Sequence, residues 1–130
     1  MSGVALVIVS HSVQLAEGVV ELAAQMAKDV ALRAAGGTDD GRIGTSFDKV
    51  SDAVTELRAA GHDVVILTDL GSATMTVESV LDFLDEEEAA HVKFADGPLV
   101  EGAVAAAVTA QVGGDLDAVV AAGRARELFS

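Results

Sequence analysis

Short apolar runs alternate along the chain with segments in which apolar residues recur every three or four positions. Residues 4–9 (VALVIV) form a continuous apolar run, which is typical of a strand covered on both faces. A weaker run at 30–35 and two further runs at 64–68 and 91–95 have the length of strands. The pattern therefore predicts four strands, of which the first is deeply buried.

The segments between these runs have the spacing that places apolar side chains on one face of a helix. One such segment lies between the first two strands, and one follows each of the next two strands. The predicted apolar faces are Leu15, Val19, Leu22 and Met26, then Phe47, Val50, Val54 and Leu57, and then Val77, Val80, Leu81 and Leu84.

Two more helices are predicted after the fourth strand. Pro98 suits the first residue of a helix, and valines at every fourth position from 100 to 108 mark the apolar face of that helix. Gly113 and Gly114 end it. Asp115 has the side chain of an N-cap for a fifth helix, from about Leu116 to Leu128.

The order of these elements, βαβαβαβαα, predicts the architecture. Crossovers of helical length place the strands parallel in one sheet. We therefore expect an α/β fold, with a single doubly wound domain over residues 1–130, a mainly parallel four-stranded sheet and helices on both faces.

Composition narrows the function classes. The chain has no cysteine, which excludes disulfides and thiolate chemistry, and no apolar run near the roughly 20 residues of a membrane span. The formal net charge is −13, and Trp and Tyr are absent. These features argue against nucleic acid and anionic membranes. A basic protein surface would suit the chain best as a macromolecular partner, and the alternative is that the acidic charge serves solubility alone. The N-terminus reads as a strand instead of a signal peptide, so we expect a cytoplasmic protein.

Ligands of an open parallel sheet bind beyond the carboxyl ends of its strands. That rule brings together four segments that are distant in sequence, namely 10–12 (SHS), 36–38 (GGT), 69–72 (DLGS) and 97–98 (GP). Glycine lets the backbone approach a ligand closely, and free N–H groups at helix starts attract anions. These segments therefore predict an anion-binding edge of the sheet.

His11 stands at the junction between the first strand and the first helix. A helix N-terminus disfavours the imidazolium, keeps the ring neutral and nucleophilic, and favours an attached phosphoryl group. His62 and His91 fall at the opposite edge of the sheet, where structural or solvent roles are expected. The alternative for His11 is a loop histidine without a chemical role.

Asp69 follows the third strand, where its carboxylate can accept the Nδ1–H of His11, fix the tautomer and direct Nε2 outward. The alternative is an N-cap for the third helix, although Ser72 could supply that cap instead. Gly71 and Ser72 could donate hydrogen bonds to phosphoryl oxygens, or could form only a turn. The set predicts a phosphohistidine carrier that needs no cofactor, metal or nucleotide of its own.

Two further features of the sequence give little support to a metal site or a nucleotide site. Asp39 and Asp40 are adjacent carboxylates without a nearby histidine, which favours a solvated loop over a metal site. The glycines of residues 36–38 are not followed by the GK[ST] sequence of a Walker loop, so direct nucleotide binding has little support.

Four stretches in this order resemble a known family. They are VIVSHSVQLAEGVVELAAQM, GGTDDGRIGTS, DLGSATMTVES and GPLVEGAVAAAV. They look like DhaM, the phosphotransferase subunits of bacterial dihydroxyacetone kinases, whose first domain is similar to the mannose-type enzyme IIA of the sugar phosphotransferase system. The resemblance covers nearly the whole chain and implies a mannose-type enzyme IIA-like fold.

The resemblance also implies a route for a phosphoryl group. His11 would accept it from the phosphocarrier HPr and pass it to ADP bound on the DhaL subunit, and the resulting ATP would phosphorylate dihydroxyacetone held by the DhaK subunit. Asp69 would orient His11, and the protein would form a homodimer. The implied phosphate-binding residues are Gly71, Ser72, Gly37, Thr38 and Thr45.

The sequence departs from the family in two respects. Some members carry HPr-like and enzyme I-like domains after this one, whereas this chain ends at Ser130, so we expect separate proteins to supply those functions. Some mannose-type enzymes IIA end in a strand exchanged between subunits, whereas the final DLDAVVAAGRARELFS is typical of a helix. The mode of dimerisation therefore stays open.

Three alternatives remain at this point. A mannose-type sugar-transporter enzyme IIA would use the same chemistry with another acceptor. A receiver-like switch, phosphorylated on Asp69 with Lys93 nearby, lacks the acidic cluster that such a domain needs after the first strand, and Lys93 falls within a strand. A non-enzymatic domain that binds a small ligand would not depend on His11.

Overall fold

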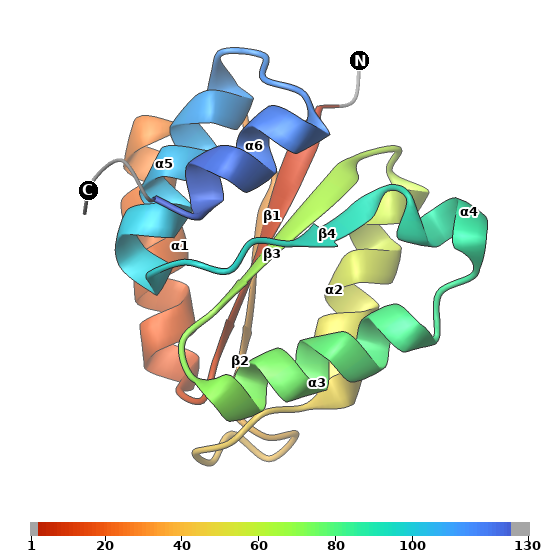
Figure 1. Cartoon of the computed structure of the whole chain (residues 1–130). Coiled ribbons are helices and arrows are strands. Elements are labelled where there is room, and N and C mark those ends of the chain that lie inside the picture. The colour runs from red at the N-terminus through yellow and green to blue at the C-terminus, as the bar shows by residue number, and fades with distance from the viewer. Residues whose placement is uncertain (1–2, 126–130) are drawn as a thin grey trace.

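The computed structural model describes residues 3–125 and contains one sheet of four parallel strands. Figure 1 shows this sheet between two layers of helices. The strands lie in the order β2-β1-β3-β4. Their bounds are Val4–Ser10 for β1, Leu32–Gly36 for β2, Asp63–Thr68 for β3 and Val92–Phe94 for β4.

Helices cover both faces of the sheet, as the sequence predicts. Helices α1, α5 and α6 pack on one face, and α2 and α3 pack on the other (Figure 1). Their bounds are Val13–Met26 for α1, Phe47–Ala59 for α2, Gly71–Asp82 for α3, Glu86–Ala89 for the short α4, Leu99–Gln111 for α5 and Leu116–Gly123 for α6. None of the helices in residues 3–125 has the length and apolar character needed to cross a bilayer.

Strand β1 lies inside the sheet and every residue in it is buried. Its side chains alternate between the two cores, with Leu6 and Ile8 toward α1 and α5 and with Val7 and Val9 toward α2 and α3. Since both faces are covered, each position of the strand favours an apolar side chain. This explains the uninterrupted VALVIV run and confirms the predicted strand covered on both faces.

Some element boundaries differ from the prediction. Strand β2 begins at Leu32 because Val30 belongs to a turn, in which its N–H donates to the Ala27 carbonyl. Strand β4 has only three residues, and the acidic stretch before it forms α4, which the sequence pattern did not predict. Pro98 is the N-cap of α5 instead of its first helical residue.

The predicted fifth helix is shorter than expected. It begins after the Asp115 N-cap, as predicted, but α6 ends at Gly123. Ala125 has a φ of 52°, in the left-handed region that an α-helix does not use. Leu128, the predicted end of this helix, lies outside the described residues.

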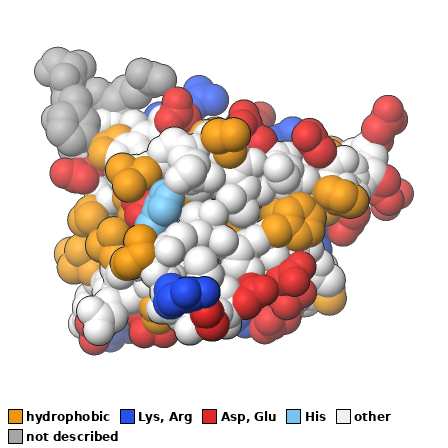
Figure 2. All heavy atoms as spheres, turned by 90° about the horizontal axis from the view of Figure 1, so that it is seen from below, with side chains coloured by type: hydrophobic (Ala, Val, Ile, Leu, Met, Phe, Trp, Pro, Cys, Tyr) orange, Lys and Arg blue, Asp and Glu red, His pale blue; other side chains and the backbone are white. Residues whose placement is uncertain are grey.

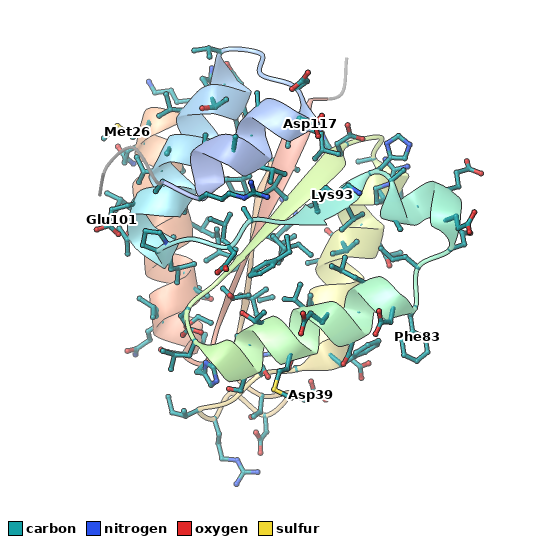
Figure 3. All side chains as sticks on the ribbon, viewed as in Figure 1. Met26, Asp39, Phe83, Lys93, Glu101 and Asp117 are labelled. Carbon is teal, nitrogen blue, oxygen red and sulfur yellow. The ribbon has the colours of Figure 1, made fainter. Side chains whose placement is uncertain are left out.

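The predicted apolar faces of two helices are wrong. In α1, Val19 is buried, but Leu15, Leu22 and Met26 are exposed by 43%, 43% and 56%; Figure 3 shows Met26 on the outer side of the helix. In α5, Val100 and Val108 are likewise exposed. The buried positions are mostly alanines, namely Ala16, Ala23, Ala103, Ala106 and Ala107. Small side chains let these helices pack closely, so the larger ones face outward.

Helices α5 and α6 approach each other through two glycines. A Cβ built on Gly102 would lie 2.3 Å from the carbonyl oxygen of Gly123. No real side chain tolerates that distance to backbone, so only glycine at position 102 permits this contact. The contact also sets α6 against β3 and Ala95, on the same side of the sheet as α1.

Gly102→Ala should lower the free energy of unfolding by about 1–3 kcal/mol, because its methyl group would push α6 away from α5. Gly18→Ala is the matched control, since a Cβ added at this helical position meets nothing within 4 Å. It should raise the free energy of unfolding by about 0.5–1 kcal/mol through helix propensity. Urea unfolding curves measure both changes, and a Gly102→Ala variant as stable as the unmodified protein would contradict the close contact.

Candidate functional site

The carboxyl ends of β1, β2 and β3 meet at one edge of the molecule. Val9 is in register with Thr68, and Ser10 is in register with Gly36. The residues that follow these strands therefore lie together, which places the SHS and DLGS segments side by side. Figure 2 views this edge directly and shows a histidine side chain at the surface.

The Asp69 carboxylate joins the ends of β1 and β3. Its Oδ2 accepts hydrogen bonds from the Ser10 hydroxyl at 2.8 Å and from the His11 backbone N–H at 3.0 Å. Its Oδ1 lies 2.9 Å from His11 Nδ1 and accepts the Leu70 backbone N–H at 2.7 Å. Both oxygens are therefore engaged, and the contact predicted between Asp69 and His11 is present.

The surroundings of Asp69 favour its ionised form. Partial burial raises the pKa of Asp69, but the hydrogen bonds from the His11 ring, the His11 backbone, the Ser10 hydroxyl and the Leu70 backbone outweigh it, and the pKa lies below its ordinary value. An ionised carboxylate is only an acceptor, so the ring nitrogen that it contacts must carry the proton. The Nδ1–H tautomer of His11 follows from this contact.

The other ring nitrogen of His11 points toward the start of α3. Its Nε2 forms a short hydrogen bond with the Ser72 hydroxyl. With the proton on Nδ1, Nε2 holds the lone pair and Ser72 acts as the donor. The His11 side chain keeps 19% of its surface exposed. The ring thus has one nitrogen fixed inside the protein and one nucleophilic nitrogen at the surface.

The start of α3 offers unpaired backbone donors beside His11. Its N-cap is Leu70, which makes no capping hydrogen bond through its side chain. Within the described residues, the N–H groups of Gly71 and Ser72 have no acceptor. A Cβ on Gly71 would meet nothing within 4 Å, so the space there is open. The alternative of Asp69 or Ser72 as N-cap is therefore wrong, and this helix end suits an anion.

Two residues to which the sequence pattern assigned no individual role also hold the site. Ser10 is completely buried, and its hydroxyl donates to Asp69 while accepting the Ser12 backbone N–H at 3.0 Å. Gly44 donates its N–H to the His11 carbonyl at 2.9 Å. The position of Ser10 just before the histidine was a usable signal. The role of Gly44 depends on loop conformation, which no sequence pattern indicates.

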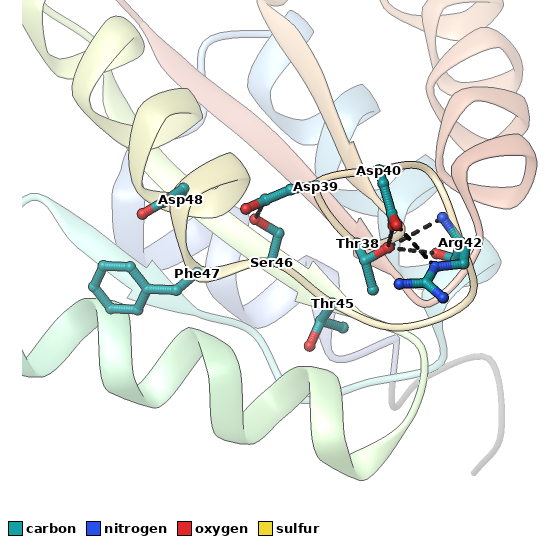
Figure 4. A pocket seen from close by; sticks show the side chains of 8 residues that line it. All are labelled: Thr38, Asp39, Asp40, Arg42, Thr45, Ser46, Phe47 and Asp48. Carbon is teal, nitrogen blue, oxygen red and sulfur yellow. Dashed lines mark hydrogen bonds and ion pairs between the residues drawn. The ribbon is translucent and has the colours of Figure 1, made fainter.

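The three residues assigned more weakly by resemblance make no hydrogen bond to the His11 ring. Gly37 has a φ of 75° and donates to the Ser10 carbonyl at 3.1 Å. Thr38 bonds within its own loop, to Asp40 and Arg42, as Figure 4 shows. Thr45 lies closer to the site, because its hydroxyl pairs with Thr76, which donates to the Ser72 carbonyl.

The remaining polar candidates are engaged elsewhere. Asp39 pairs with the Ser46 hydroxyl and Asp40 with Arg42, which fits the solvated loop that the sequence favoured. Within residues 3–125, no three metal-ligating side chains form a cluster. His91 lies 2.7 Å from Asp63 at the start of β3, and His62 lies 3.3 Å from the Gly3 carbonyl, so both occupy the opposite edge, as predicted.

Comparison with known proteins places this fold and site in a family. Residues 5–120 match the EIIA-man family, which is described as the PTS system fructose IIA component. The chain belongs to the EIIA-man family. This assignment confirms the enzyme IIA-like fold that the sequence predicted.

Relatives of the chain include several named DhaM. It is 45% identical over 119 residues to the "PEP-dependent dihydroxyacetone kinase, phosphoryl donor subunit DhaM" of Escherichia coli K12, an alignment that covers 88% of this chain and 25% of the relative. It is 38% identical over 114 residues to the "PTS-dependent dihydroxyacetone kinase, phosphotransferase subunit DhaM" of Lactococcus lactis, with 88% of both chains covered. The matched region is thus a quarter of the Escherichia coli relative.

Two solved structures share the fold. The crystal structure of a protein of unknown function, EF1359, superposes with a TM-score of 0.87 at 34% identity and covers 96% of this chain and 95% of its own. A sigma-54 interaction domain protein from Enterococcus faecalis superposes with a TM-score of 0.71 at 15% identity, over 98% of this chain and 97% of its own, and shows the fold alone.

Asp69→Asn should lower the free energy of unfolding at neutral pH. In acid the variant and the unmodified protein should be equally stable. The pKa of Asp69 is lower in the folded than in the unfolded protein, so its stabilisation is fully present above the unfolded value of about 4 and is lost as the pH falls through the folded value. Urea unfolding between about pH 7 and pH 3 should therefore show the two proteins converging below about pH 4.

The control for this measurement is Asp52→Asn, at an exposed carboxylate on α2 that makes no hydrogen bond or ion pair with the described residues. The effect of Asp52→Asn on the free energy of unfolding should not shrink in this way as the pH falls. A difference for Asp69→Asn that grew in acid would contradict the hydrogen-bonded, ionised carboxylate.

Proposed function

We propose that this chain is the phosphohistidine carrier of a dihydroxyacetone kinase, with His11 as the nucleophile that receives and passes on the phosphoryl group. The observation that carries the proposal is the His11 ring, held by Asp69 through Nδ1 with Nε2 at the open start of α3. The names of the Escherichia coli and Lactococcus lactis relatives support the choice of kinase.

The phosphoryl-accepting step follows from this geometry. The Nε2 lone pair attacks the phosphorus of phospho-HPr, a new N–P bond forms, and the N–P bond of the donor breaks with its electron pair returning to the donor imidazole. Because Nδ1 keeps its proton, the phosphorylated His11 ring carries a positive charge. The ionised Asp69 stabilises that charge and holds the ring in place.

The start of α3 would then receive the phosphoryl oxygens. The Ser72 hydroxyl turns from Nε2 to an oxygen, and the N–H groups of Gly71 and Ser72 supply two more donors together with the helix dipole. Gly37, Thr38 and Thr45 stay proposed members of this pocket by resemblance alone.

The proposal also includes the acceptor of the phosphoryl group from His11. His11 would pass the group to ADP on DhaL, and the ATP formed there would phosphorylate dihydroxyacetone on DhaK. We propose that residues 1–130 act as one phosphocarrier domain, in the cytoplasm and as a homodimer.

The receiver-like alternative has less support. The four hydrogen bonds on Asp69 occupy the carboxylate that a receiver would phosphorylate. Lys93 is exposed in the middle of the three-residue β4 and does not follow the strand (Figure 3). A sugar-transporter enzyme IIA stays the second candidate, because the description of the matched family names a fructose IIA component.

His11→Gln should abolish phosphorylation by phosphoenolpyruvate, enzyme I and HPr while the fold stays intact, because it removes Nε2 from a partly exposed ring. His91→Gln is the control and should be phosphorylated normally. The phosphorylated protein should be labile in acid and stable in base, as phosphohistidine is. An acid-stable label, or a label on His11→Gln, would reject the proposal.

The protein that accepts the phosphoryl group distinguishes a dihydroxyacetone kinase subunit from a sugar-transporter enzyme IIA. Phosphorylated protein mixed with DhaL and ADP should lose its label, with ATP as the product. Phosphorylated protein mixed with the IIB domain of a mannose-type transporter should keep it. The reverse result would assign the chain to sugar transport and leave the role of His11 unchanged.

A further inference from the structure

Asp69, His11 and Ser72 form a continuous series of hydrogen-bonded side chains, which we call the triad. The Asp69 carboxylate lies 2.9 Å from His11 Nδ1, and the Ser72 hydroxyl donates to His11 Nε2. Because the ring carries its proton on Nδ1, the lone pair of Nε2 faces the hydroxyl hydrogen. A serine hydrolase activates its nucleophile through the same order of groups. The triad can therefore move a proton away from Ser72.

The place of Ser72 in the fold suits a nucleophile. Ser72 is the second residue of α3, and only Asp69 and Leu70 separate this helix from β3. A serine at a sharp turn from strand to helix has its hydroxyl outside the sheet, where a substrate can reach it. Ser72 is exposed, and among the described residues its hydroxyl binds only His11.

The start of α3 also supplies donors for an oxyanion. When a hydroxyl attacks an ester carbonyl, negative charge moves onto the carbonyl oxygen, and hydrogen bonds to that oxygen lower the barrier. The N–H groups of Gly71 and Ser72 have no acceptor within residues 3–125. A Cβ on Gly71 would meet nothing within 4 Å, so the space beside these donors is open. The nucleophile and the oxyanion donors thus lie in the same turn of the chain.

The general base of the triad is oriented before a substrate binds. Asp69 contacts both the ring and the backbone N–H of His11, and it accepts a further hydrogen bond from Ser10 at 2.8 Å. Ser10 is completely buried, which keeps the carboxylate in place. The carboxylate stabilises the imidazolium that forms when Nε2 takes the serine proton, and a base that is already in place loses little entropy during the reaction.

The surroundings of Ser72 restrict its substrates to small, reactive esters. Leu70 and Met75 lie on either side of Ser72 in the sequence and are exposed by 62% and 67%, so they offer apolar contact to an acetyl or aryl group. The site is open to solvent instead of enclosing a ligand, so little binding energy is available to lower the barrier. A good leaving group must therefore make the ester reactive.

We propose that Ser72 is a second nucleophile of this protein, which His11 and Asp69 activate for acyl transfer from small activated esters. The Ser72 oxygen bonds to the carbonyl carbon while its proton passes to His11 Nε2. The bond to the leaving group breaks with its electron pair, and the leaving group takes that proton. In the second step Nε2 takes a proton from water, the resulting hydroxide attacks the acyl carbon, and the Ser72 oxygen leaves and regains the proton.

The test uses p-nitrophenyl acetate as the ester. The unmodified protein should release a burst of about one p-nitrophenol per chain, followed by slower turnover, and peptide mass mapping should place the acetyl group on Ser72. Ser72→Ala should lose the burst, and His11→Gln should slow acylation about 100-fold or more. Ser79→Ala is the matched control, since Ser79 is an exposed serine of α3 whose hydroxyl donates to the Met75 carbonyl at 3.1 Å. This variant should behave as the unmodified protein.

Three results would overturn the proposal. They are the absence of a burst, an acetyl group on Ser72 that forms as fast in His11→Gln, and an undiminished burst in Ser72→Ala with the acetyl group on His11. The last result would make the imidazole itself the nucleophile. The activity does not depend on the phosphocarrier function, because no phosphoryl donor takes part. Failure of phosphorylation by phosphoenolpyruvate, enzyme I and HPr, with acetylation of Ser72 intact, would reject the proposed function alone.

Discussion

The arrangement of the site depends on one carboxylate. Asp69 accepts two hydrogen bonds from the His11 residue itself, one from Ser10 and one from Leu70, so it fixes the end of β1 against the end of β3. The sheet makes this possible, because the parallel register of these strands sets Val9 beside Thr68 and brings their carboxyl ends to one edge. The tautomer and the direction of the His11 ring both follow from that contact.

The chemistry proposed for this edge coincides with a helix start that lacks a side-chain cap. Helices α1, α2, α4 and α6 begin at Ser12, Ser46, Asp85 and Asp115, each of which caps its helix through a side-chain oxygen. The N-caps of α3 and α5 are Leu70 and Pro98, and neither makes a side-chain capping hydrogen bond; of these two helix starts, that of α3 lies beside His11. A cap is worth about 0.5–2 kcal/mol of stability, so its absence has a cost. The same absence leaves the N–H groups beside His11 free for an anion, which fits the proposed role of this helix start.

The sequence predicted the parts of the structure that depend on regular patterns. The VALVIV run identified a strand covered on both faces, and the rule that ligands bind at the carboxyl ends of parallel strands predicted that His11 and Asp69 lie together. The faces of α1 and α5 could not be predicted in this way. A helix face is predicted from the spacing of large apolar residues such as Leu and Val. These two helices pack through alanines and through Gly102 instead, and the fit of Gly102 depends on the neighbouring backbone. The contact from Gly44 to His11 depends likewise on a loop conformation.

Close packing through small residues has a consequence for the surface. When alanines fill the contact between two layers, the large apolar side chains of the same helices are left outside, as for Leu22 and Met26. Such a surface would associate unselectively if it were uncharged. The net charge of −13 opposes that unselective association, because other acidic proteins repel the chain over roughly a Debye length of 8–10 Å. Apolar contact is then available mainly to partners of opposite charge. On this view the strong acidity and the exposed apolar residues act together, since repulsion between like charges limits the association that apolar contact alone would allow.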